Sequence, residues 1–91
     1  MKRLTLIIHG GVQGIFFRAF VKEHAIGVGF TGTVENLPNG TVEVIAEGKE
    51  EVLREFLHVI QGKHPFARVE RIEEKWGRET GIFSNFTILH R

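Results

Sequence analysis

Apolar residues near the start of the chain alternate with other residues, which is the pattern of a β-strand with a buried face. Leu4, Leu6 and Ile8 should form that face, and we expect this strand in the interior of a sheet. Farther along, the apolar spacing becomes helical, and Gly27 and Gly29 should end the helix. The expected members of its buried stripe are Phe17, Phe20, Val21, Ala25 and Val28.

Two further strands, 30–37 and 41–47, are predicted on either side of the segment 38–40, Pro-Asn-Gly, which is typical of a hairpin turn. Apolar residues alternate with glutamates along the second of these strands. We therefore expect one face to pack on helices and the other, with Glu43 and Glu47, to meet solvent. The sheet should then be covered on one side only.

The second half of the chain predicts a helix over 50–61, with acidic residues in its first turn. Its apolar stripe should consist of Val52, Phe56, Val59 and Ile60. Pro65 lies in a loop that leads to a strand over about 67–76. Val69 and Ile72 have opposite parity in that strand, which requires a β-bulge or burial on both faces.

A polar surface loop over 77–81 and a short strand over 86–89 are expected at the end of the chain. The main elements follow the order strand, helix, strand, strand, helix, strand, as in a duplicated β-α-β unit. We therefore predict an α+β, ferredoxin-like sandwich: an antiparallel sheet with two helices on one face, plus the short C-terminal strand. A chain of 91 residues predicts a single domain, 1–91.

Composition and charge exclude several classes of function. Hydrophobic residues make up 42% and charged residues 25% of the chain, and 12 Lys and Arg against 11 Asp and Glu leave a formal net charge of +1. This balance favours neither a nucleic-acid nor a membrane partner, so any preference for anions must be local. The apolar run 4–8 is too short for a signal peptide or a membrane span, and no cysteine is present. We expect a cytoplasmic monomer.

The segment 8–18, Ile-His-Gly-Gly-Val-Gln-Gly-Ile-Phe-Phe-Arg, joins the first strand to the first helix. Gly10, Gly11 and Gly14 allow positive φ and a close approach of a ligand to the backbone amides. Such a turn forms a concave nest of N–H groups, to which the helix adds unpaired donors and its positive dipole end. Arg18 adds a permanently charged fork that suits two phosphate oxygens. The turn is therefore a candidate phosphate site.

Two motifs in the chain resemble those of the acylphosphatase family. The motif aliphatic-x-Gly-x-Val-Gln-Gly-x-x-Phe-Arg is matched by Ile8, Gly10, Val12, Gln13, Gly14, Phe17 and Arg18. The motif Gly-x-Val-x-Asn-x-x-x-Gly-x-Val, followed six residues later by Gly, is matched by Gly32, Val34, Asn36, Gly40, Val42 and Gly48. The resemblance implies the same ferredoxin-like fold. It also implies hydrolysis of acyl phosphates to a carboxylate and inorganic phosphate, without metal or cofactor.

The resemblance also implies roles for individual residues. The loop amides and the Arg18 guanidinium would bind the phosphoryl group, so that the phosphate-binding residues are Gly11, Val12, Gln13, Gly14, Ile15, Phe16, Phe17 and Arg18. Asn36 would hold the attacking water, since a neutral amide accepts from water without repelling phosphate. Gly11 and Glu35 stand where basic residues are usual in the family, which should leave the site less positive.

The remaining candidate residues have simpler interpretations. The five histidines are scattered without the spacing of a metal site, so no metal is predicted. Ser84 lies in no nucleophile motif. The aromatic strand motif of RNA-binding ferredoxin-like sheets is absent. The phenylalanines that we expect in the core are Phe16, Phe17, Phe20, Phe30 and Phe56.

Two alternatives to an acylphosphatase remain open. A non-catalytic anion-binding or regulatory module would keep the phosphate loop without turnover. An acylphosphatase-like domain directed at carbamoyl phosphate, as in hydrogenase maturation proteins, would keep the fold and change the substrate. Such domains belong to much longer chains, whereas this chain ends about where the expected fold ends.

Overall fold

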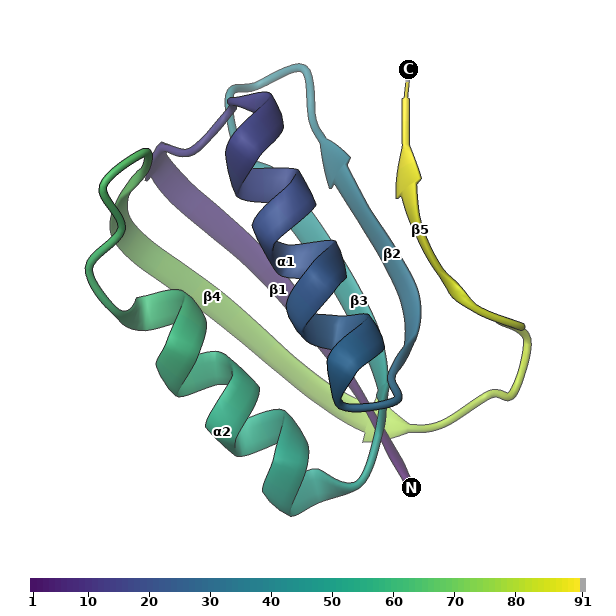
Figure 1. Ribbon diagram of the computed structural model, residues 1–91. Helices are drawn as coiled ribbons and strands as arrows, with labels where there is room; N and C mark the ends of the chain where they lie inside the picture. The colour runs from purple at the N-terminus through teal and green to yellow at the C-terminus, as the bar shows by residue number, and fades with distance from the viewer. Residues whose placement is uncertain (91) are drawn as a thin grey trace.

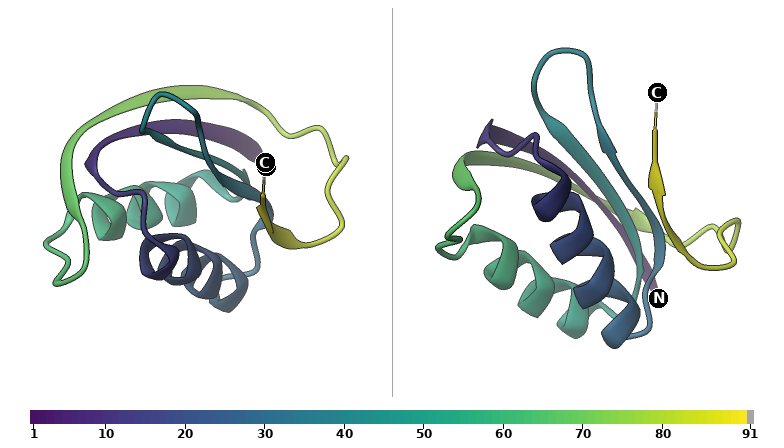
Figure 2. Two further views of the ribbon diagram at one scale, coloured as in Figure 1. Left: turned by 90° about the horizontal axis from the view of Figure 1, so that it is seen from above. Right: turned by 45° about the horizontal axis from the view of Figure 1, so that its top comes forward.

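The computed structural model describes residues 1–90, apart from the side chain of Ile15. The elements are β1 (Lys2–Gly11), α1 (Ile15–Gly27), β2 (Thr31–Asn36), β3 (Val42–Gly48), α2 (Glu50–Gln61), β4 (Arg68–Arg78) and β5 (Phe86–Leu89). The described strands form a sheet in the order β4-β1-β3-β2-β5, and both helices pack on the same face of it (Figure 1). Figure 2 shows the sheet curving over the two helices.

The directions of the strands confirm the ferredoxin-like α+β prediction. β3 pairs antiparallel with both β1 and β2, and β4 pairs antiparallel with β1. The short C-terminal strand β5 pairs parallel with β2, so the complete sheet is mixed. Neither of the helices in residues 1–90 is long and apolar enough to cross a membrane.

The core lies between the sheet and the helices. Leu4, Leu6 and Ile8 of β1 are completely buried there, as their alternation predicts. The first helix buries Phe17, Val21 and Ala25, which follow one another at intervals of four residues. The prediction for Val28 was wrong, because α1 ends at Gly27 and Val28 is exposed where the chain turns toward β2.

The second helix begins and ends at the predicted residues, but its buried face is rotated from the expected one. Two members of the expected stripe, Val52 and Val59, are only half-buried. The residues that are buried, at helical spacing, are Leu53, Phe56, Leu57 and Ile60. The amphipathic pattern thus predicted the bounds of the helix correctly. It placed the centre of the buried face about one residue position from where the structure has it.

A β-bulge, one of the two arrangements expected for the fourth strand, lies opposite the end of β1. The register between the two strands shifts between His9 and Gly10, which leaves Glu70 as an extra residue. As a result Val69 and Ile72 both pack against the core in spite of their opposite parity. Gly10 has a φ of 132°, and a side chain there would collide with a backbone carbonyl of β4. Only glycine fits this close approach.

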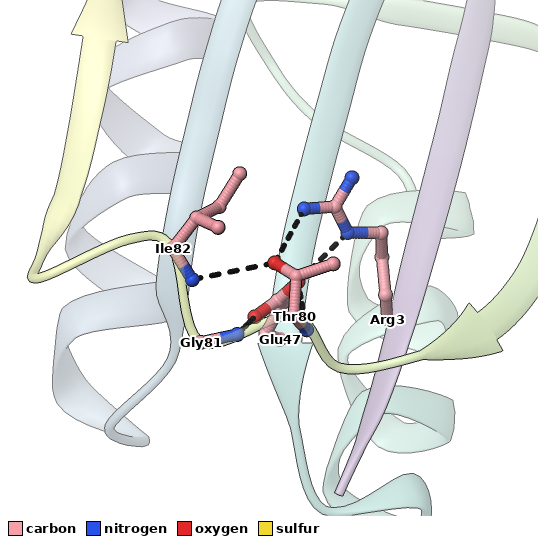
Figure 3. A network of polar contacts seen from close by, with 5 residues as sticks. All are labelled: Arg3, Glu47, Thr80, Gly81 and Ile82. Atoms are coloured by element: carbon pink, nitrogen blue, oxygen red, sulfur yellow. Dashed lines mark hydrogen bonds and ion pairs between the residues drawn. The ribbon is translucent and has the colours of Figure 1, made fainter.

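Glu47 of β3 corrects the prediction that the open face of the sheet carries only solvated glutamates. Residues 79–85 link β4 at one edge of the sheet to β5 at the other, and they cover Glu47, which is 3% exposed. Its carboxylate accepts hydrogen bonds from Arg3 Nε at 2.7 Å, from the Thr80 amide and hydroxyl at 3.0 and 2.8 Å, and from the Gly81 amide at 3.0 Å (Figure 3). The expected loop is therefore tied to the sheet.

The hydrogen bonds to Glu47 determine how strongly its charge contributes to stability. Burial alone would raise the pKa of Glu47, but the donors from Arg3, Thr80 and Gly81 outweigh it and lower the pKa from 4.5 to about 2. Because the folded pKa lies below the unfolded one, this stabilisation is present above pH 4.5 and is lost as the pH falls through about 2.

We predict that Glu47→Gln lowers the free energy of unfolding at pH 7 by roughly 2 kcal/mol, the size of a hydrogen bond to a charged group. The difference from the wild type should shrink as the pH falls from 4.5 toward 2. Urea unfolding over this pH range measures it, with Glu43→Gln on the same strand as the control. A difference that stays constant with pH would contradict the account.

Candidate functional site

The predicted site residues lie at one end of the molecule because three strands point the same way. β1 and β2 are both antiparallel to β3, and β5 is parallel to β2. The last residues of these strands are Gly11, Asn36 and Leu89, and they therefore lie at the same end of the sheet. Figure 1 shows this end of the sheet beside the start of α1, whose first turn carries Arg18. The fold thus brings the two motifs together.

The first turn of α1 lacks the groups that usually neutralise a helix N-terminus. Gly14 is its N-cap residue and offers no side-chain hydrogen bond, and no acidic residue stands in the first turn. The other helix, in contrast, has Glu50 and Glu51 in its first turn. The first N–H groups of α1 and its positive dipole end therefore remain available to an anion.

The glycines of the loop do not all act as the sequence predicts. Among the three glycines at positions 10, 11 and 14, Gly10 is the one with positive φ, and there the conformation serves the contact with β4. Gly14 is extended, and a Cβ placed on it would meet no atom within 4 Å, so the turn is open at this point. Its amide donates to the Val12 carbonyl at 3.0 Å, which engages one of the predicted phosphate donors within the loop.

The side chain of Gln13 connects the loop to the β2–β3 hairpin. Its Nε2 donates to the carbonyl oxygens of Leu37 at 2.6 Å and Thr41 at 2.9 Å. Leu37 directly follows Asn36, so this bridge fixes the loop relative to Asn36. Sequence reasoning assigned Gln13 only a backbone role. The available signal was the motif itself, which specifies glutamine where a backbone donor would need no particular side chain.

Arg18 and Asn36 each present a buried polar atom without a partner. Among the described residues, the buried side-chain N and O atoms that make no hydrogen bond are Arg18 Nε and Asn36 Oδ1. Leaving such a group unpaired costs about 1–3 kcal/mol, so unpaired groups of this kind call for an explanation. Within residues 1–90 no carboxylate forms an ion pair with Arg18. A bound anion and its water would complete both residues.

Two neighbours of the site differ from what the sequence predicts. Arg18 Nη1 lies 3.4 Å from Nδ1 of His90, a residue that sequence reasoning left without a role. Phe16 was expected in the core but is 70% exposed, because the core-facing position of the first turn belongs to Phe17. The side chain of Ile15, between Gly14 and Phe16, lies outside the described part of the chain.

The histidines make separate contacts in different parts of the fold. His9 Nε2 lies 2.6 Å from a carboxylate oxygen of Glu73 on the open face of the sheet. His64 packs against the rings of Phe20 and Phe66, with ring centroids 4.9 and 5.7 Å away. In residues 1–90, no group of three or more His, Cys, Asp or Glu side chains is arranged to hold a metal ion.

The family model and the most similar sequences identify the acylphosphatase family. The sequence model of the Acylphosphatase family matches residues 4–88. An acylphosphatase from Thermus thermophilus is 46% identical over 82 residues, which cover 90% of this chain and 93% of that protein. The crystal structure of the acylphosphatase from Bacillus subtilis superposes with a TM-score of 0.91 at 34% identity, over 98% of this chain and 99% of that one.

A similar fold also occurs as a segment of a longer protein. HypF from T. kodakarensis matches with a TM-score of 0.84 and 33% identity over all of this chain, but over only 12% of its own.

The bridge made by Gln13 predicts that Gln13→Ala weakens the binding of inorganic phosphate about tenfold, because the loop loses its fixed position. Isothermal titration calorimetry measures the dissociation constant, and urea unfolding measures the accompanying loss of stability. Gln61→Ala, an exposed change at the end of α2, is the matched control. Unchanged phosphate affinity in Gln13→Ala would show that the bridge serves only stability.

Proposed function

The chain belongs to the acylphosphatase family, and we propose that it hydrolyses the carboxyl-phosphate bond of acyl phosphates to a carboxylate and inorganic phosphate. One observation carries the proposal for the site. Arg18 and Asn36, which the two motifs mark, each hold a buried polar atom without a partner, and Arg18 lies in the first turn of a helix whose N-terminus is uncapped. This pairing supports a site built for a phosphoryl group and a water.

In the proposed mechanism, Arg18 and the backbone of residues 11–17 bind the phosphoryl group. A guanidinium stays charged at every working pH and contacts two oxygens at once. The unpaired N–H groups in the first turn of α1 add donors whose direction the helix fixes. The absence of a carboxylate partner of Arg18 within residues 1–90 supports this role, since its charge is not neutralised there.

Asn36 then orients the nucleophile. Its Oδ1 accepts a hydrogen bond from water, and the oxygen of this water attacks phosphorus while the bond from phosphorus to the acyl oxygen breaks. The electron pair of the broken bond leaves with the carboxylate, which is a good leaving group and needs no general acid. The proton of the water passes to a phosphoryl oxygen, so that neither a histidine nor a carboxylate is required at the site.

The bridge from Gln13 gives this mechanism its geometry. The phosphate loop and Asn36 come from separate segments, and catalysis by positioning needs them fixed to each other. Gln13 and the residues it bonds are 24 and 28 positions apart in the chain. The hydrogen bonds from Gln13 to Leu37 and Thr41 do this without contacting the proposed reacting atoms. The change Gln13→Ala should therefore affect the positions of the groups and leave their chemistry unchanged.

We predict that Arg18→Ala and Asn36→Ala each reduce the turnover of benzoyl phosphate about a hundredfold to a thousandfold. Arg18→Lys should restore little, because an ammonium lacks the planar fork. The rates are measured with EDTA present and corrected for spontaneous hydrolysis. Arg54→Ala and Asn85→Ala, which change exposed residues far from the site in sequence, serve as matched controls.

Phosphate binding separates the two roles and tests the alternatives. Asn36→Ala should still bind inorganic phosphate, whereas Arg18→Ala should not. Near-normal turnover in either variant would refute the role proposed for that residue. A wild-type chain that binds phosphate through Arg18 but hydrolyses no acyl phosphate would be a non-catalytic anion-binding module. A marked preference for carbamoyl phosphate would instead indicate the carbamoyl-directed alternative.

A further inference from the structure

The geometry of the proposed reaction decides on which side of the phosphoryl group the acyl part must lie. In phosphoryl transfer the attacking and leaving oxygens stand roughly in line across phosphorus. Asn36, which would hold the attacking water, is the last residue of β2. The acyl group must therefore extend away from Asn36 and β2, on the other side of phosphorus. This step rests on the function proposed above.

The contacts of α1 show what lies on each side. Arg18 points toward the edge of the sheet that carries β2 and β5, since its Nη1 lies 3.4 Å from His90 just beyond β5. Phe16 stands two positions earlier, a rotation of about 200° around a helix of 3.6 residues per turn. Phe16 therefore projects from nearly the opposite side of the helix, away from β2 and β5.

The opposite side is the aromatic surface between α1 and the α2–β4 loop. Phe20, one turn after Phe16 on the same side of the helix, has its ring centroid 5.7 Å from that of Phe66 in this loop. Figure 1 shows the α2–β4 loop on the side of the β1–α1 turn that faces away from β2. Phe16 and Phe66 remain 70% and 41% exposed. Both apolar rings are thus open to a ligand.

We propose that Phe16, together with Phe66, binds the acyl group and makes the chain select acyl phosphates with aromatic or bulky apolar acyl groups over acetyl phosphate. The phosphate loop recognises a group that all acyl phosphates share, so selection must come from contacts beyond it. Phe16 lies in the first turn of α1, directly after the loop, and its ring is exposed on the side of the helix away from β2. Burial of two rings against each other supplies the discrimination.

The test compares kcat/KM for benzoyl phosphate and acetyl phosphate in the wild type and in Phe16→Ala. We expect the value for benzoyl phosphate to fall about fivefold to tenfold. The value for acetyl phosphate should change less than about twofold, because the substitution removes the ring and keeps the backbone amide of residue 16, the only part of Phe16 that the proposed mechanism uses. Phe66→Ala should have a smaller effect in the same direction. Ile82→Ala is the control, because Ile82 is equally exposed, at 71%, but lies in the loop before β5.

Two results would overturn the proposal. Equal losses for both substrates in Phe16→Ala would mean that the ring supports the phosphate loop, and no loss for either would mean that the acyl group does not touch it. Binding of benzylphosphonate and methylphosphonate, measured by calorimetry, separates this proposal from the proposed function. If the wild type hydrolyses nothing, a Phe16-dependent preference for benzylphosphonate still supports the acyl contact, and the lack of one refutes it.

Discussion

The antiparallel pairing of β3 with both of its neighbours is the constraint on which the site depends. Because β1 and β2 each run opposite to β3, they finish at the same end of the sheet, and the phosphate loop comes to lie near Asn36. Strand direction alone brings the segments to the same region. The Gln13 side chain then fixes their relative position through two hydrogen bonds to the hairpin. A topological rule and one side chain together form the proposed site.

Buried polar groups are hydrogen-bonded at one end of the sheet and lack partners at the other. At the far end of β3, the Glu47 carboxylate accepts hydrogen bonds from Arg3, Thr80 and Gly81, and its charge stabilises the fold. At the site, Arg18 Nε and Asn36 Oδ1 are left without partners, at a cost of about 1–3 kcal/mol each. Such a cost is expected where the missing partner is a ligand.

Local patterns predicted the fold well, and contacts between distant segments account for the errors. Turn chemistry and helical periodicity depend on neighbouring residues, so the hairpin at 38–40 and the helix over 50–61 were predicted correctly. Glu47 was assigned to solvent because its partners lie more than thirty positions away, and no period reveals a loop that crosses the sheet. The bridge from Gln13 was missed for the same reason. Phe16 was misplaced because Phe17 takes the core-facing position in the first turn of α1, and the helical rotation turns Phe16 outward.

In the proposed mechanism an oriented water attacks phosphorus rather than the acyl carbon. Hydrolysis of benzoyl phosphate in water labelled with heavy oxygen, followed by mass spectrometry of both products, tests it in a single measurement. Attack on phosphorus should put the label in inorganic phosphate and leave benzoate unlabelled, since the acyl oxygen leaves with its carboxylate. Label in benzoate would place the attack on the acyl carbon and would contradict the roles assigned to Arg18 and Asn36.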